Sequence, residues 1–388
     1  MHERRDQMGV SHLLEHMVFK GTQRRSARDI ALSLEALGGS LDAYTSREHT
    51  VYQARVLDEH LPVAADVIGD MVFEPTLRPS DLELERNVVL EEIAMVEDTP
   101  DDLVFELHNE ALWGTHPLGY SILGTRKSVK ALGVKELKAL HTRAYQPSNI
   151  VVIAAGSVDH DQLVRILDET GWTGRTDRKN ARAATRVAQV RAQKPTRRIV
   201  RRDGAQTHIV LGAPTIGYGD PRRHALVLLS VVLGGGMSSR LFQRVREELG
   251  LAYSVYTFQT FHAACGVHGV YVGTSPKTAR AALVAIEEEL DKVARTGVGD
   301  AEVLQGKGQL KGQLTLSLES PTARMYRAAA VELYGEPYRP LDEMLRLIDD
   351  IEADTLHELA RQYLTPSAQT VLTLGAPQQS GTSRKRRG

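Results

Sequence analysis

Apolar residues near the start of the chain recur with the spacing of an amphipathic helix: Val10, Leu13, Leu14, Met17 and Val18. At about 100° per residue these positions share one helical face. The opposite face carries His12, Glu15 and His16 within an arc of roughly 100°. The pattern predicts a helix whose polar face is either ordinary exposed surface or a cluster with its own chemistry.

A second pattern appears twice along the chain. Residues Leu132 to Gly156 and residues Ile351 to Gly375 each combine a helical period, a Pro-Ser turn and an apolar β-rich run that ends in glycine. They lie about half a chain apart, which predicts a duplicated domain. The alternative is a chance similarity between two helix-turn-strand units of a common kind.

Earlier segments of each half support the duplication. Asp29 to Leu57 reads as a helix, a Gly-Gly break and then strands, and His224 to Phe258 places a helical pattern beside glycine repeats and ends in a β-rich run. Long helices mixed with short strands predict the α+β class. We expect two homologous domains, each with helices packed on a mostly antiparallel sheet.

A basic stretch rich in small residues, Thr176 to Gly204, separates the halves and has no apolar period at its start. This composition is typical of an exposed linker, and RNA binding by its arginines is the less favoured alternative. The predicted domains are residues 1–180 and 201–378, the predicted linker is 181–200, and residues 379–388 are predicted to be a disordered tail.

Composition and charge narrow the class of protein. With 388 residues, 42% of them hydrophobic and 25% charged, the chain has the composition of a soluble protein of two or more domains. A net charge of -1 gives no reason to expect a nucleic-acid partner. The single cysteine, Cys265, excludes an internal disulfide and a cysteine zinc cluster. The apolar run Ala225 to Met237 is too short to span a bilayer, and the first residues lack a signal-peptide pattern, so we expect a cytoplasmic protein with no membrane partner.

The polar face of the first helix has the residue types of a zinc site. Histidines at positions i and i+4 lie one turn apart, so His12 and His16 can both reach one Zn²⁺ at about 2.0–2.1 Å. Glu15 projects beside the metal and is placed to take a proton from metal-bound water. His-x-x-Glu-His is the inverted form of the zincin signature. A plain polar outer face remains the alternative.

A zinc hydrolase needs a third protein ligand, and Ser80 to Asp102 offers one. Ser80 and Glu83 form a predicted capping box that starts a helix. On this helix Glu85 and Glu92 share a face with three apolar residues, Val88, Val89 and Val96. A buried carboxylate is costly unless it is paired or binds metal. Glu92 is the predicted ligand and Glu85 the carboxylate that orients a ligand histidine, with a salt bridge to a core arginine as the alternative.

Together these motifs resemble the inverzincin peptidases of the pitrilysin family (M16), in particular the branch of the mitochondrial processing peptidase β subunit and its bacterial relatives. The stretch "HLLEHMVFKGT" is similar to the family's zinc helix and the loop after it. The spacings of Glu85 and Glu92 from His16 are similar to those of the family's glutamates. Leu41 to Val56 and His116 to Thr125 are also similar to family segments.

The resemblance implies further roles. The segment "SSRLFQRVREELGLAYSV" is similar to one whose arginine and tyrosine reach into the family's active site, so Arg246 and Tyr253 take catalytic roles by that match. Members pair two homologous domains, with the zinc helix only in the first, and two such pairs form a clamshell. We therefore expect one Zn²⁺ per chain and a homodimer, or a heterodimer with a related subunit.

Family members usually carry further strands ahead of the zinc helix, whereas His12 stands close to Met1 here. We expect the first sheet to lack those N-terminal strands, or Met1 not to be the natural start. Missing strands would expose sheet edges and core and lower stability.

The predicted function is that of a zinc-dependent endopeptidase acting on unfolded peptides or presequence-like segments. An edge strand would pair with the substrate backbone through five residues: Leu41, Asp42, Ala43, Tyr44 and Thr45. The alternative is a non-catalytic partner subunit of a heterodimeric peptidase or of an assembly complex. Nucleotide binding by Leu233 to Arg240 is disfavoured, because this glycine-rich stretch lacks the P-loop and dinucleotide spacings.

Overall fold

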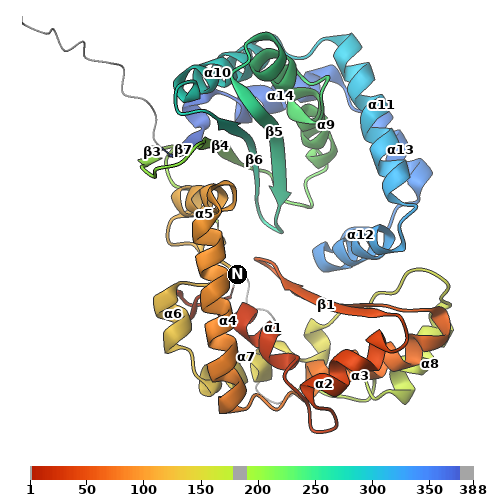
Figure 1. The fold of residues 1–388 in the computed structure, drawn as a ribbon. Coiled ribbons are helices and arrows are strands. Elements are labelled where there is room, and N and C mark those ends of the chain that lie inside the picture. Colours follow the sequence, from red (N-terminus) through yellow and green to blue (C-terminus); the bar gives the residue numbers. More distant parts are fainter. Residues whose placement is uncertain (1, 178–189, 376–388) are drawn as a thin grey trace, which may run out of the picture. The chain divides into compact units, whose positions relative to one another are not determined.

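The computed structural model describes residues 2–177 and 190–375, which form two compact units of helices and sheet (Figure 1). Unit 1 comprises Met1–Asp98, Thr115–Gln189 and Ser320–Leu333, and unit 2 comprises Thr99–Gly114, Val190–Glu319 and Tyr334–Gly388. The predicted α+β class is confirmed. One helix from each sequence half therefore belongs to the other half's unit. The predicted tail and residues 181–189 of the predicted linker lie outside the described residues.

Unit 1 is mainly helical, with one two-stranded antiparallel sheet, β1–β2. Its elements are η1 (Arg5–Gln7), α1 (Val10–Val18), α2 (Ala27–Glu35), β1 (Ser40–Thr45), β2 (Thr50–Arg55), η2 (Asp58–His60), α3 (Leu61–Phe73), α4 (Pro79–Asp98), η3 (Pro117–Gly119), α6 (Arg126–Ala131), α7 (Val134–Ala144), η4 (Pro147–Asn149), α8 (His160–Glu169) and most of α12 (Pro321–Tyr334). Its core joins the apolar face of α1, including fully buried Leu13 and Met17, to Val67 of α3, Val89 of α4 and Leu137 of α7.

Unit 2 is built on a five-stranded sheet of order β3-β7-β4-β6-β5, in which only the β3–β7 pair is parallel. Its elements are α5 (Pro100–Trp113), β3 (Arg197–Val200), β4 (Thr207–Thr215), α9 (Arg223–Gly234), the π-helical segment η5 (Phe242–Glu248), β5 (Ala252–Phe261), β6 (Gly266–Thr274), α10 (Ala279–Thr296), α11 (Asp300–Ser317), α13 (Leu341–Asp349), α14 (Ala353–Tyr363), η6 (Pro366–Ala368) and β7 (Thr370–Leu374). The last four residues of the predicted linker are therefore not linker but strand β3, because their backbone pairs with β7.

The inner strands of the sheet in unit 2, β4, β6 and β7, are covered on both faces, whereas the outer strands β3 and β5 keep exposed residues. Alternate residues of β4 point to opposite sides, so Leu211 enters the core with α9, α10 and α14 while Val210 packs with Val104 of α5. Burial on both faces explains the nearly unbroken apolar pattern of β4 and β6. The glycine at the end of α9 has a packing role, because a Cβ on Gly234 would lie 2.6 Å from the backbone nitrogen of Thr257.

The two similar segments fold alike up to their last part. α7 is followed by η4, and α14 is followed by η6, as the pattern predicts. The second apolar run then forms β7 between β3 and β4, whereas residues 151–155 form no strand. The prediction of a strand over residues 151–155 was therefore wrong. The physical reason is that a strand needs a hydrogen-bonding neighbour, and no strand of the described chain pairs with this run.

Amide hydrogen exchange will distinguish these two runs. We expect the amides of residues 151–155 to exchange on the order of 10³-fold faster than those of Val371–Leu374, because β7 is paired on both sides and opens only with much of its unit. Each run serves as the control for the other within one protein, measured by exchange and mass spectrometry. Strong protection of residues 151–155 would show that this run has a strand partner in solution and would contradict the prediction.

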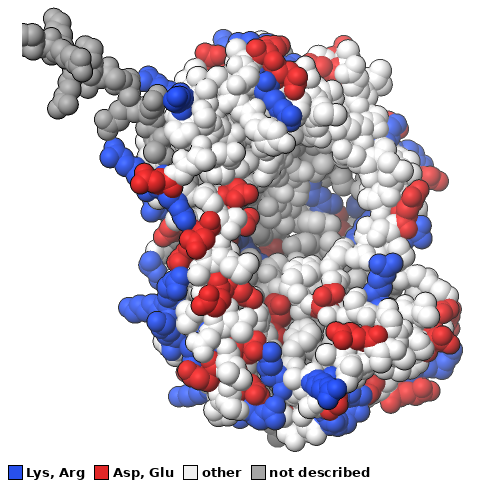
Figure 2. All heavy atoms as spheres, in the orientation of Figure 1, with Lys and Arg blue, Asp and Glu red and all other residues white. Residues whose placement is uncertain are grey.

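Acidic and basic side chains are interspersed over the visible face in Figure 2, in keeping with the net charge of -1. Among the described helices, none combines the length and the apolar character needed to cross a membrane.

Candidate metal centre

Helix α1 carries the predicted site and is held at its start by an unusual cap. The helix begins after Gly9, whose φ of 89° favours glycine and whose missing side chain cannot cap the helix. Glu3 replaces that cap: its carboxylate oxygens accept hydrogen bonds from the backbone nitrogens of Gly9 and Ser11, both at 2.8 Å. The negative charge of Glu3 also interacts favourably with the positive end of the helix dipole. Glu3 therefore fixes the start of the helix that carries both histidines.

The cap can be tested by replacing Glu3 with alanine. We expect Glu3→Ala to destabilise α1 by about 1 kcal/mol, which makes exchange of its amides about fivefold faster. The matched control is Glu35→Ala, which removes an exposed carboxylate at the end of α2. Equal exchange rates in α1 for Glu3→Ala and the unsubstituted protein would show that Glu3 does not cap the helix.

The three predicted metal ligands come together in unit 1. His12 and His16 project from α1, and Glu92 projects from α4, and one ligand atom of each lies within 4.8 Å of the others. The Nε2 of His12 is 3.6 Å from Oε2 of Glu92, and the Nε2 of His16 is 3.6 Å from Oε1. Two imidazole nitrogens and one carboxylate oxygen form a common donor set for catalytic zinc.

The polar atoms of these three residues do not satisfy one another by hydrogen bonding, and their chemistry suits a bound cation. Oε2 of Glu92 is buried and has no hydrogen-bond partner among the described residues, which is costly for a carboxylate. Burial, assisted by the neighbouring imidazole of His16, lowers the pKa of His12 to about 4. His12 is therefore neutral at pH 7, and a neutral imidazole is the form that binds metal. The donors thus fit a zinc ion.

Helix α4 differs in two details from its prediction. It begins at Pro79 rather than at a Ser80 cap, because proline suits the first helical turn, where its missing N–H has no acceptor. Its buried face consists of Leu82, Glu85, Val89 and Ile93. Val88 is 44% exposed, so it does not belong to the predicted apolar stripe, and Glu92 lies at the border of the buried face.

Glu85 lies behind His16 as predicted for an orienting carboxylate. Its Oε2 is 3.2 Å from Nδ1 of His16. Because an ionised carboxylate can only accept a hydrogen bond, this contact favours the form of His16 in which Nδ1 carries the proton and donates the hydrogen bond. The lone pair of Nε2 then faces Glu92. The other oxygen of Glu85 is 2.7 Å from Nζ of Lys20, a residue that the sequence reasoning did not single out. Its position four residues after His16 was the available signal.

Glu15 is buried beside the histidines and receives a hydrogen bond from the hydroxyl of Thr45. Burial raises the pKa of Glu15, while the bond from Thr45 acts in the opposite direction. The imidazole of His16 lowers this pKa and the charge of Glu92 raises it, and both effects are smaller than that of burial. A raised pKa suits a carboxylate that must accept a proton.

The predicted substrate strand is β1, which contains Leu41, Asp42, Ala43, Tyr44 and Thr45. It pairs with β2 along one edge, and no described strand pairs with its other edge. Its last residue is Thr45, so this strand reaches the Glu15 carboxylate. On its outer face, the ring of Tyr44 lies 6.0 Å from that of Tyr326.

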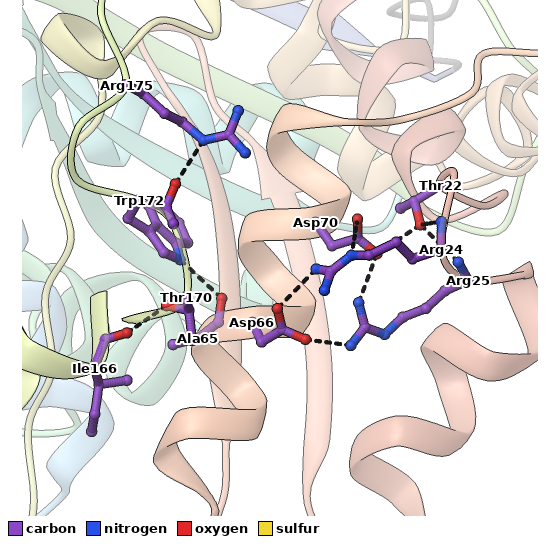
Figure 3. Close-up of polar contacts among 11 residues, drawn as sticks. Thr22, Arg24, Arg25, Ala65, Asp66, Asp70, Ile166, Thr170, Trp172 and Arg175 are labelled. Carbon is purple, nitrogen blue, oxygen red and sulfur yellow. Dashed lines mark hydrogen bonds and ion pairs between the residues drawn. The ribbon is translucent and has the colours of Figure 1, made fainter. Parts of the chain in front are cut away.

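The loop after α1 is fastened to α3 by a charge network (Figure 3). Asp70 accepts hydrogen bonds from the hydroxyl of Thr22 at 2.6 Å, from Nε of Arg24 at 3.1 Å and from Nη1 of Arg25 at 2.7 Å. Asp66 accepts from both arginines. Although burial opposes the effect, these bonds lower the pKa of both carboxyl groups. The network therefore holds the loop in one position at neutral pH.

Arg246 and Tyr253 lie together in unit 2. Arg246 belongs to η5 and Tyr253 to β5. The guanidinium carbon of Arg246 is 4.7 Å from the ring centre of Phe242 and 5.1 Å from that of Tyr253. Tyr253 is 77% exposed, so its hydroxyl is available to a ligand. Their catalytic roles stay predictions.

Two family models match the chain in succession. Residues 1–126 match insulinase (peptidase family M16), and residues 131–310 match the peptidase M16 inactive domain. The chain therefore belongs to peptidase family M16, as the motifs predicted.

Curated relatives carry names of the same kind. An uncharacterized zinc protease of Streptomyces coelicolor is 40% identical over 92% of this chain and 78% of its own length. The uncharacterized zinc protease YmxG of Bacillus subtilis is 38% identical over 94% of this chain and 88% of its own length.

Solved structures share the fold. A peptidase M16 inactive domain from Pseudomonas fluorescens is 22% identical, with a TM-score of 0.86, over 95% of this chain and 89% of its own. A protease from Helicobacter pylori is 20% identical, with a TM-score of 0.88, over 96% and 90% of the two chains. At these identities the similarity concerns the fold.

Proposed function

We propose that this protein is a zinc-dependent endopeptidase that hydrolyses unfolded peptides. The observation that supports it most is the convergence of His12, His16 and Glu92 within 4.8 Å, with Glu15 buried beside them. Three protein ligands leave a fourth position open, as catalytic rather than structural zinc sites do. The zinc protease names of the relatives agree with this proposal.

Each residue of the site would have a separate role in the proposed reaction. His12, His16 and Glu92 would hold the ion. A bound zinc ion supplies a lowered pKa for water and an electrophile that stabilises negative charge on the peptide carbonyl oxygen. Glu15 accepts the proton of the attacking water and passes it to the leaving amine. Roles of Arg246 and Tyr253 in stabilising the developing negative charge are predictions from the family resemblance.

The free edge of β1 supplies the proposed substrate contact. An extended peptide that adds to this edge bonds through its main chain, which depends little on side-chain identity. A folded protein rarely offers a free main chain of this kind, so we propose a preference for unfolded polypeptides or presequence-like segments. Because β1 ends at Thr45, whose hydroxyl bonds Glu15, a paired peptide would run toward the general base.

Metal analysis beside a cleavage assay tests the proposal. We expect about one zinc per chain and cleavage of a reduced, alkylated protein but not of its folded, disulfide-intact form, which serves as the matched substrate. A chelator should abolish cleavage, and added zinc should restore it. Zinc binding without cleavage of any unfolded substrate would instead favour the non-catalytic partner subunit.

A further inference from the structure

Lys20 occupies a defined position behind the candidate metal centre. Backbone bonds from Phe19 to His16 and from Lys20 to Met17, both 3.2 Å, continue the last turn of α1. Lys20 therefore stands one turn after His16 and on the same side. Its Nζ lies 2.7 Å from Oε1 of Glu85, while Oε2 of the same carboxylate lies 3.2 Å from Nδ1 of His16.

The surroundings explain why a cation is needed here. Glu85 has a side chain that is only 8% exposed, and a buried carboxylate is costly unless both oxygens are satisfied. Two more carboxylates, Glu15 and Glu92, lie beside the same histidines. In the described structure, Lys20 is the one lysine or arginine that forms an ion pair with any of the three. It therefore offsets part of the negative charge around the imidazoles.

The backbone of Lys20 is itself fixed. Its carbonyl oxygen accepts a hydrogen bond of 2.9 Å from Nη2 of Arg78, at the start of α4. The loop that follows is fastened to α3 through Thr22 and Asp70 (Figure 3). The ammonium group thus reaches Glu85 from a supported position rather than from a free loop.

We propose that Lys20 is a positioning residue that acts through Glu85. By holding Oε1, it turns Oε2 toward His16, so that His16 keeps its proton on Nδ1 and presents the lone pair of Nε2 toward Glu92. Outer partners of this kind commonly set the tautomer of a ligand histidine and its affinity for metal. This proposal rests on the proposed function only in taking the metal to be zinc; the contacts of Lys20 and Glu85 do not depend on which reaction the protein catalyses.

Three substitutions test this role. Lys20→Met keeps most of the stem and removes the charge, Lys20→Arg keeps the charge, and Lys138→Met removes an exposed lysine of α7 as the control. In the metal-free protein, nitrogen NMR of the histidine rings should show His16 protonated on Nδ1, and Lys20→Met should shift it toward a mixture of tautomers. Zinc affinity, measured by competition with a chelator, should fall about tenfold for Lys20→Met, the lower end of the range for outer partners.

Lys20→Arg should restore both readouts, and Lys138→Met should change neither. The proposal is overturned if Lys20→Met folds normally and keeps the His16 tautomer and the zinc affinity, or if Lys20→Arg is as impaired as Lys20→Met. Should Lys20→Met fold poorly, Lys20→Gln provides the same comparison. Because neither readout uses peptide cleavage, a protein that binds zinc but cleaves nothing would contradict the proposed peptidase and still decide the role of Lys20.

Discussion

Glu15→Gln is expected to bind zinc as tightly as the unsubstituted protein and to hydrolyse peptides about 10²–10⁴-fold more slowly. Glutamine has the same shape but cannot accept the proton of the attacking water at neutral pH. The ligands His12, His16 and Glu92 are untouched, so metal binding should persist. Zinc content and the steady-state rate on one unfolded peptide measure the two effects.

Stability separates a catalytic effect from a structural one. Glu15 is buried and its pKa is raised by burial, so a neutral amide is no worse accommodated than the carboxylate. The hydroxyl of Thr45 can donate to the amide oxygen instead. Glu15→Gln should therefore unfold at an unchanged or higher temperature, and Glu35→Gln, at an exposed site in the same unit, should leave all readouts unchanged. Full activity of Glu15→Gln would refute Glu15 as the base.

Glu92→Ala is expected to lose both zinc and turnover. Two histidines from a single helix turn remain as ligands. Loss of a residue that hydrogen-bonds to a metal ligand typically weakens metal binding about 10–100-fold, and loss of a ligand itself should weaken zinc binding by more than that. The matched control is Glu91→Ala, because Glu91 is the adjacent carboxylate but is exposed. Chelator competition and the cleavage rate measure the result.

Glu92→Ala and its control Glu91→Ala should differ in how zinc affects their thermal unfolding. A ligand that binds only the folded state raises stability with its concentration, so zinc should raise the melting temperature of the unsubstituted protein and of Glu91→Ala. For Glu92→Ala, zinc should have little effect. Without metal, the substitution should not destabilise the fold, because it removes a buried carboxylate oxygen that has no partner. An unchanged response to zinc in Glu92→Ala would exclude Glu92 as a ligand.

Local periodicity explains why most residues of the candidate site could be predicted from the sequence. The spacing of apolar residues in α1 alone places His12, Glu15 and His16 on one side, because the faces of a helix are set by residues only three and four positions apart. The selection of Glu92 used the same geometry together with the cost of burying a carboxylate. The details that failed, the Ser80 cap and Val88, concern where a helix begins and how wide its buried face is. Both depend on what packs against it.

The sequence by itself determined the α+β class, the repeated pattern in two halves, the helix that carries His12 and His16, and the candidate ligands. Only the tertiary structure decided that Lys20 meets Glu85, that Thr45 meets Glu15, and that residues 151–155 form no strand although their counterpart forms β7. The physical reason is the same in each case. Each of these features depends on a partner distant in sequence, and periodicity carries no information about which distant residues the fold brings close.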